Sequence, residues 1–336
     1  MRILLLADTH LGFDEPLHPR VERRRRGPDF FANFLRALEP ARRGVVDVVV
    51  HGGDVFYRSK VPPALVARAF AVLAGLPVPV LVVPGNHERS RIPHPLLAVH
   101  RNVFLFDRPR TYVVGGVAFS GFPFDGQVRM RFASLVEQAR GPPAAVRVLC
   151  LHQAVEGGRV GSPEFLFRDG PDVVRGRDLP AGFAAVLSGH LHRAQRLVRG
   201  LDGTPFAAPV FYPGSVERTS FAEREETKGF LIVTLGGGGV ESCRFVPLPA
   251  RPMVDLTVAS VSELRSRLLA LPPDAIVRVR EGPPVSAAEL RELAPPSMNV
   301  ELVYERWASA AAARRSSLPF GPRGSEGTRT TDRGRR

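Results

Sequence analysis

Aspartate, asparagine and histidine follow five apolar runs of this sequence, each at the point where the run stops. Such runs predict short buried strands, and ligands of open α/β sheets bind outside the carboxyl ends of the strands. A lone histidine there is more often a core residue. Because burying histidine without hydrogen bonds is costly, its recurrence favours one shared site. The side chains concerned are Asp8, His10, Asp54, Asn86, His87, His152, His190 and His192.

This donor set is typical of a divalent metal site. Carboxylate, amide and imidazole ligands without thiolates favour Mn²⁺ first, while Fe²⁺, Zn²⁺ and Mg²⁺ remain open. The pairs Asp8/His10 and His190/His192 are each two residues apart, so in an extended chain both members of a pair would point to the same side. We therefore expect two metals side by side, the usual device for in-line displacement at phosphorus. Two such ions less two aspartates leave a charge of about +2 to bind a phosphate.

The clearest strand end lies in residues 45–56, VVDVVVHGGDVF. Its β-branched start predicts a strand buried on both faces, and Gly52-Gly53 predict a tight turn that exposes Asp54. Apolar residues at helical spacing predict helices over 30–38 and 65–76. Further strands are expected at 3–6, 78–83, 146–151, 183–187, 210–212 and 229–246, with a hairpin over 110–124. This alternation of strands and helices indicates the α/β class.

A proline-rich linker at 247–252 divides the chain. After it the pattern predicts strand, helix, strand, helix, strand, and both helices begin with a capping box, Ser260/Glu263 and Ser286/Glu289. Beyond Trp307 the chain consists mainly of Ala, Arg, Gly and Ser, with little to bury, so we expect disorder there. The predicted domains are 1–250, a small α/β domain at 251–308, and a disordered Arg-rich tail at 309–336.

The charge favours a polyanionic partner, because the net charge is +13 and 44 of the 46 basic residues are arginine. The tail carries +5 of this excess and the rest of the chain +8. A run at 20–26, RVERRRR, has even odds of contacting phosphate or lying on a solvated surface. The two cysteines give no disulfide framework. No apolar run is long enough for a membrane span or a signal peptide, so we expect a cytoplasmic protein.

Five motifs in this order resemble the calcineurin-like metallophosphoesterases: D8-x-H10, G53-D54, G85-N86-H87-E88, H152 and G189-H190-L191-H192. Further residues resemble the SbcD-type nuclease subunits of DNA double-strand-break repair, namely DTHLG at 8–12, GDVF at 53–56, HQ at 152–153, PGSVER at 213–218 and KGF at 228–230. The resemblance covers about residues 1–250. It implies a four-layer α/β/β/α sandwich with the metals at one edge and a small C-terminal α/β cap domain.

The resemblance also implies a role for each side chain. Asp8, His10, Asp54 and His192 would hold the first metal, and Asp54, Asn86, His152 and His190 the second. His87 would be a catalytic residue at the scissile phosphate that stabilises charge and helps to protonate the leaving oxygen. One departure is Glu88, because the nuclease group usually carries aspartate there and protein phosphatases of the superfamily carry glutamate.

Three functions are weighed. The first is a metal-dependent DNA exo- or endonuclease in double-strand-break repair, for which the resemblance implies DNA, an SbcC-like ATPase and a second copy of the chain as partners. The second is a nucleotide or small-molecule phosphodiesterase, because the metal site alone does not choose a substrate. The third is a non-catalytic DNA-binding subunit, which the charge alone would support and the full ligand set argues against.

Overall fold

We analysed a computed structural model that describes residues 1–14, 24–88, 100–161 and 165–303. The predicted tail at 309–336, Trp307 and part of the basic run at 20–26 lie outside the described residues. The chain divides into two compact units, Met1–Met253 and Val254–Arg336. This division falls within a few residues of the predicted linker, and each unit is described by itself. No helix of the described residues is long and apolar enough to cross a membrane.

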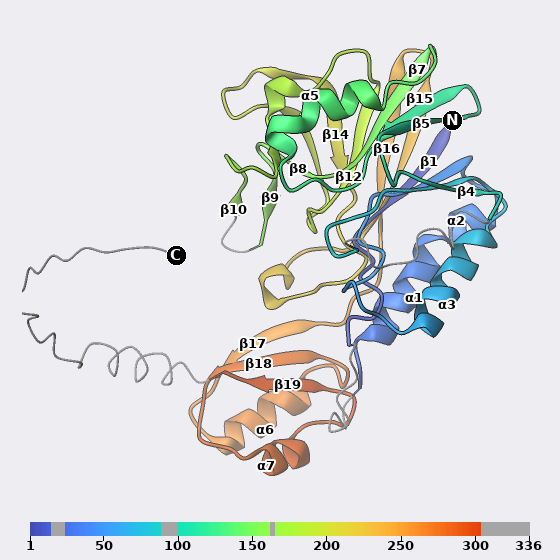
Figure 1. The fold of residues 1–336 in the computed structure, drawn as a ribbon. Coiled ribbons are helices and arrows are strands. Elements are labelled where there is room, and N and C mark those ends of the chain that lie inside the picture. The colour runs from blue at the N-terminus through green and yellow to red at the C-terminus, as the bar shows by residue number, and fades with distance from the viewer. Residues whose placement is uncertain (15–23, 89–99, 162–164, 304–336) are drawn as a thin grey trace, which may run out of the picture. The chain divides into compact units, whose positions relative to one another are not determined.

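The first unit contains two six-stranded sheets (Figure 1). One has the order β16-β15-β1-β2-β3-β4, with strands β1 (Arg2–Leu6), β2 (Val48–His51), β3 (Val80–Val82), β4 (Val103–Leu105), β15 (Gly229–Gly236) and β16 (Gly239–Pro247). The other has the order β13-β14-β12-β7-β6-β5, with strands β5 (Arg110–Val114), β6 (Val117–Gly121), β7 (Val146–His152), β12 (Ala185–Gly189), β13 (Gln195–Arg199) and β14 (Pro205–Tyr212).

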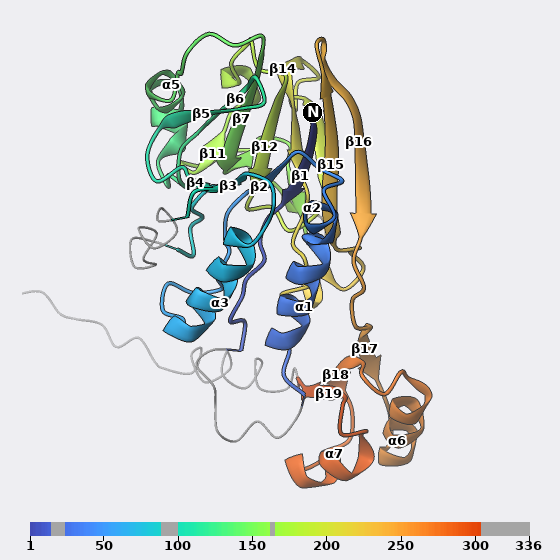
Figure 2. The ribbon, with the colours of Figure 1, turned by 90° about the vertical axis from the view of Figure 1, so that its right-hand side faces the viewer.

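Helices cover the outer faces of both sheets. Helices α1 (Gly27–Ala37) and α3 (Pro63–Ala74) lie side by side on the first sheet, with the short α2 (Glu39–Arg42) after α1, while α5 (Val128–Gln138) packs on the second sheet (Figure 2). Strand β1 shows why the layers form, since Leu4 and Leu6 face the helices whereas Ile3 and Leu5 face the other sheet. The predicted four-layer α/β/β/α sandwich is therefore confirmed.

Short elements complete this unit. They are β8 (Ala154–Val155), β9 (Arg159–Val160), β10 (Phe165–Leu166), β11 (Val173–Val174) and the 3₁₀ turns η1 (Gly176–Asp178) and η2 (Phe221–Glu223). Each is two or three residues long, too short for a periodic pattern, and the sequence analysis predicts none of them.

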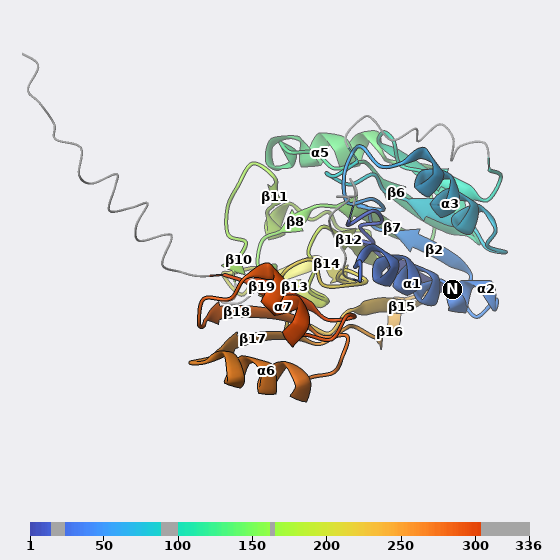
Figure 3. The same cartoon turned by 90° about the horizontal axis from the view of Figure 1, so that it is seen from below.

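The second unit has a three-stranded sheet in the order β17-β18-β19 (Figure 3). Its elements are β17 (Met253–Thr257), α6 (Val261–Ala270), β18 (Ile276–Glu281), α7 (Ala287–Leu293) and β19 (Asn299–Leu302), in the predicted order. The capping box at Ser286 and Glu289 is present. The one predicted at Ser260 is incomplete, because the Glu263 carboxylate accepts from the backbone N–H of Ala259 instead of Ser260.

Candidate metal centre

The register of the two sheets brings the predicted residues to one edge. Leu6 of β1 pairs with His51 of β2, and His51 pairs in parallel with Val82 of β3. In the second sheet, His152 of β7 pairs with Gly189 of β12. The carboxyl ends of these five parallel strands therefore lie together. His152 is the last residue of β7, and the loops that follow the other strands carry the remaining seven side chains.

The loops leave the extended conformation at once. Asp8, His10, Asp54 and His190 have positive φ angles of 51°, 44°, 51° and 87°. The expectation that the Asp-x-His and His-x-His pairs lie in extended chain is therefore wrong, because left-handed residues turn the backbone sharply. Such strained positions persist when surrounding structure fixes them, and they cluster at functional sites.

Backbone hydrogen bonds tie the first two loops together. The N–H of Asp8 donates to the carbonyl of Gly53 at 2.9 Å, and the N–H of His10 donates to the carbonyl of Asp54 at 3.1 Å. Gly53 has φ of 105°, and a Cβ atom there would lie 2.2 Å from Nδ1 of His152. The turn before Asp54 thus needs glycine both for its conformation and for the close approach of an imidazole.

Asp54 contacts side chains from two other strand ends and belongs to two groups of residues that could hold a metal ion. Its Oδ1 atom accepts from the N–H of His87 at 3.0 Å, and its Oδ2 atom lies 3.4 Å from Nε2 of His152 and 3.8 Å from Nε2 of His87. A Cβ atom at Gly85 would lie only 2.1 Å from Oδ1 of Asp54, so Gly85 lets the third loop approach this carboxylate.

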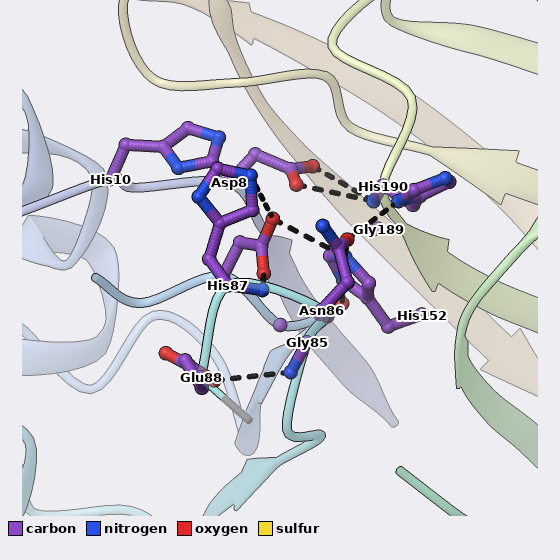
Figure 4. A network of polar contacts seen from close by, with 12 residues as sticks. Asp8, His10, Gly85, Asn86, His87, Glu88, His152, Gly189 and His190 are labelled. Atoms are coloured by element: carbon purple, nitrogen blue, oxygen red, sulfur yellow. Dashed lines mark hydrogen bonds and ion pairs between the residues drawn. The ribbon is translucent and has the colours of Figure 1, made fainter. Parts of the chain in front are cut away.

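Asn86 joins the third loop to the second sheet (Figure 4). Its Oδ1 atom lies 3.0 Å from Nε2 of His152 and 2.9 Å from Nδ1 of His190. The N–H of His190 lies 3.2 and 3.1 Å from the two carboxylate oxygens of Asp8. The four groups meet although they come from four separate strand ends.

His10 and His192 face each other through their Nε2 atoms, 2.9 Å apart. Three sets of side chains have ligand atoms within 4.8 Å of one another: Asp8, His10 and His192; His10, Asp54 and His87; and Asp8, Asp54 and His152. The structure thus brings together all eight residues that the sequence singled out, because Asn86 contacts His152 and His190 contacts Asp8.

The electrostatics of the cluster favour a bound cation. Burial raises the pKa of Asp8 from 3.8 to about 6. Burial would lower the pKa of His152, but Asp54 outweighs it and raises that pKa from 6.5 to about 9. Burial would also raise the pKa of Asp54, but His152 holds it well below its ordinary value. In the protein alone, a proton on His152 therefore compensates the buried carboxylates.

A pair of divalent cations fits these residues. Asp8 and Asp54 are 0% and 2% exposed, and no Lys or Arg of the described residues forms an ion pair with either. The Nδ1 atom of His10 is buried without a hydrogen-bond partner among them. Nδ1 of His152 donates to the Gly52 carbonyl at 2.7 Å, so when the ring loses its second proton the lone pair lies on Nε2, which can then bind a metal.

Two residues that the sequence analysis missed support the cluster. His51 is fully buried, accepts from the N–H of Gly53 at Nδ1 and contacts the Thr9 hydroxyl through Nε2 at 3.0 Å. Glu223 contacts Nδ1 of His192 at 3.0 Å. His51 stands directly before the Gly-Gly-Asp turn, which was a usable signal. Glu223 lies in the short turn η2, between the PGSVER and KGF motifs but in neither of them.

The comparisons agree with this geometry. The family model described as calcineurin-like phosphoesterase matches residues 1–194, more than half of the chain. The chain belongs to this family.

Its curated relatives include proteins named DNA double-strand break repair protein Mre11. The one from Saccharolobus solfataricus is 28% identical over 62% of this chain and 53% of that protein. The one from Haloferax volcanii is 31% identical over 87% and 64%, and the one from Methanosarcina mazei 30% over 76% and 40%. The chain thus spans between 40% and 64% of the length of these relatives.

Proposed function

We propose that this chain is a two-metal-dependent DNA exo- or endonuclease of double-strand-break repair. The observation that carries the proposal is the convergence of two buried aspartates with five histidines and an asparagine at one sheet edge. The relatives named for double-strand break repair support DNA as the substrate. The net charge of +13 agrees with a polyanionic substrate.

The ligand sets follow from the resemblance and are consistent with the distances. Asp8, His10, Asp54 and His192 would hold the first ion, with Asp54 shared, and the second would be held by Asp54, Asn86, His152 and His190. Mn²⁺ suits these oxygen and imidazole donors first. Bound ions would supply Lewis acidity, neutralising phosphate charge and lowering the pKa of an attacking water.

His87 has the geometry of a proton donor. Its Nδ1 atom contacts the carbonyl oxygen of Tyr57, so a proton there fixes the ring and leaves Nε2 facing the cluster. The His87 side chain is 33% exposed, whereas those of His152 and Asp54 are 0% and 3% exposed. A partly exposed imidazole beside buried ligands can reach a substrate oxygen. In its imidazolium form, His87 would deliver the Nε2 proton to the poor alkoxide leaving group and keep the Nδ1 proton as the neutral ring.

The remaining parts of the chain have proposed roles in assembly. The small α/β unit would act as a cap that helps to shape DNA access, as the resemblance implies. An SbcC-like ATPase and a second copy of the chain are the proposed protein partners, and the cytoplasm the proposed compartment.

A nucleotide or small-molecule phosphodiesterase is the alternative, because the metal site alone does not choose a substrate. Glu88 is the residue that departs from the nuclease group. In the structure, however, Glu88 does not supply a metal ligand. It is buried, and its two carboxylate oxygens accept from the N–H groups of Phe56 and Gly85, both at 3.1 Å. Glu88 therefore joins two loops, and its identity says little about the substrate.

The test is incubation of the purified full chain with Mn²⁺ and end-labelled single- or double-stranded DNA. Bis(p-nitrophenyl) phosphate serves as the small diester, and Asp54→Asn as the control for contaminating nucleases. Mn²⁺-dependent cleavage of DNA that Asp54→Asn abolishes would support the proposal. Hydrolysis of the small diester without DNA cleavage would favour the alternative. Tight DNA binding with neither activity would favour the non-catalytic subunit.

A further inference from the structure

His192 has a carboxylate behind its imidazole ring. Nε2 points at Nε2 of His10 inside the cluster, whereas Nδ1 points away from it to Oε1 of Glu223 at 3.0 Å. Because an ionised carboxylate only accepts, the proton of the neutral ring lies on Nδ1. The Nε2 lone pair is thereby directed to the position of the first metal.

Glu223 is itself fixed by several donors. Thr219 donates its hydroxyl to Oε1 and its backbone N–H to Oε2, the latter at 3.2 Å. Lys228 lies 2.6 Å from Oε2, and the side chain of Glu223 is only 8% exposed. Because Lys228 lies within ion-pairing distance and Thr219 donates to both oxygens, the Glu223 carboxylate is paired with a cation and accepts at each oxygen.

Lys228 belongs to the same arrangement. Its side chain is 0% exposed, and its ammonium group also donates to the carbonyl of His192 at 2.9 Å and to Glu226 at 2.8 Å. A buried ammonium is stable only when such partners surround it. Lys228 thus contacts both the backbone of His192 and the carboxylate behind its ring, which fixes the orientation of the imidazole.

The other histidines of the described cluster lack such a partner. Nδ1 of His152 and Nδ1 of His87 contact backbone carbonyls, and Nδ1 of His190 contacts the amide oxygen of Asn86. Nδ1 of His10 has no hydrogen-bond partner among the described residues. A carboxylate makes the imidazole a more basic ligand than a carbonyl does. In the part of the chain that the structure describes, only the first metal position therefore has a histidine ligand whose ring is hydrogen-bonded to a carboxylate at Nδ1.

We propose that Glu223 is a positioning residue for the first metal. It holds His192 in the tautomer with the proton on Nδ1 and increases the basicity of Nε2, and Lys228 orients Glu223. The inference rests on the proposed function, because it takes His192 to be a ligand. It goes beyond that function by assigning a residue outside the family motifs and by predicting that the affinities of the two ions depend differently on it.

Glu223→Gln is the sharpest variant, since it keeps the shape and removes the charge. In the wild type, the two carboxylate oxygens of Glu223 share the surrounding hydrogen-bond donors. A glutamine side chain has a single oxygen to accept from them. If its oxygen faces Lys228, its NH₂ group faces Nδ1 of His192 and moves the ring proton to Nε2, the metal-binding atom. Glu226→Gln is the matched control, because Glu226 also pairs with Lys228 and is 7% exposed. Among the described residues its carboxylate forms ion pairs with Lys228 and Arg193 and with no candidate metal ligand.

The experiment titrates Mn²⁺ into the full-length wild type and both variants by calorimetry, with bound metal counted after dialysis. We expect Glu223→Gln to weaken one of the two ions about 10–100-fold and to leave the other at the wild-type affinity. Glu226→Gln should leave both unchanged. A long-range ¹⁵N spectrum of histidine-labelled, metal-free protein should show the His192 proton on Nδ1 in the wild type and in Glu226→Gln, but not in Glu223→Gln.

Two results would overturn the inference while leaving the proposed function intact. One is unchanged binding of both ions by a folded Glu223→Gln, and the other is an equal loss in Glu223→Gln and Glu226→Gln. A wild type that binds no metal would instead remove the proposed function itself. If Glu223→Gln does not fold, Glu223→Asp replaces it. Aspartate keeps the charge but is one methylene shorter, so it should also weaken one ion selectively.

Discussion

The Oδ2 atom of Asp54 lies 3.4 Å from Nε2 of His152, and the two residues follow strands of different sheets. Asp54 comes after β2 in the first sheet, and His152 ends β7 in the second. Both are withdrawn from water, with 2% and 0% exposure. The contact therefore joins the two halves of the sandwich at the edge where the other candidate ligands gather.

Replacing Asp54 should empty both metal positions at once. Asp54→Asn removes the charge that offsets the repulsion between two cations, while its size is kept. We expect the purified variant to retain less than one ion per chain after dialysis, where the wild type retains two. Metal analysis of the dialysed protein measures this directly.

Asp8→Asn and His190→Ala provide the comparison, since each belongs to one proposed ligand set. Each should lower the affinity for one ion and spare the other. If Asp54→Asn bound two ions normally, the shared-ligand assignment would be wrong.

Metal binding should release protons at neutral pH. The pKa of His152 is raised to about 9 in the metal-free site, so this ring is charged at pH 7 and must lose its proton before Nε2 can bind a metal. Affinity should therefore rise with pH, about tenfold per unit for each proton displaced, and level off above about 9.

Calorimetry in buffers of different ionisation enthalpy measures the number of protons released. His152→Gln, which cannot carry that proton, is the control and should release fewer. Equal release from the wild type and His152→Gln would show that another group holds the proton.

The proton on His152 should also stabilise the metal-free fold. Since its folded pKa of about 9 lies above its ordinary value of 6.5, the stabilisation is complete below pH 6.5 and is lost as pH rises through 9. Thermal unfolding of the metal-free protein between pH 6 and 10 should show this fall. If the stability of His152→Gln fell by the same amount over this pH range, the fall would belong to other groups.

Much of the site could be predicted from sequence because its chemistry is local to strand ends. The run before Asp54 is apolar and β-branched, and its end is marked by two glycines, so both the strand and the turn are visible in one dimension. The same holds for Asn86 and His190. Parallel strands then bring such ends together, whatever their separation in sequence.

What the sequence could not give depends on contacts between distant loops. Asp8 and His10 adopt left-handed backbone because the second loop holds their N–H groups, and no local pattern encodes that partner. Glu223 acquires its role only through the approach of His192. Helix α5 was missed for a different reason, since its apolar stripe has few members and is interrupted by arginines.

His87→Ala should separate catalysis from metal binding. Nε2 of His87 lies 3.8 Å from Asp54, farther than Nε2 of His152 at 3.4 Å, and the proposed role of His87 is proton donation. We expect two bound ions but turnover reduced about 10²–10⁴-fold, the range of general acid catalysis. The loss should be smaller with bis(p-nitrophenyl) phosphate, because nitrophenolate leaves without a proton. A variant that also lost its metal would place His87 among the ligands.

Glu88→Asp should loosen the two central loops. The carboxylate of Glu88 spans the N–H groups of Phe56 and Gly85 at 3.1 Å each, and aspartate is one methylene too short to reach both. Because a buried N–H group left without an acceptor costs about 1–3 kcal/mol, the metal-free variant should be less stable by that amount. Chemical denaturation of wild type and variant measures the difference. Metal affinity should fall as well, since these loops carry Asp54 and Asn86. Unchanged stability would mean that the chain accommodates either acid, and Glu88 would then have no special role in joining the loops.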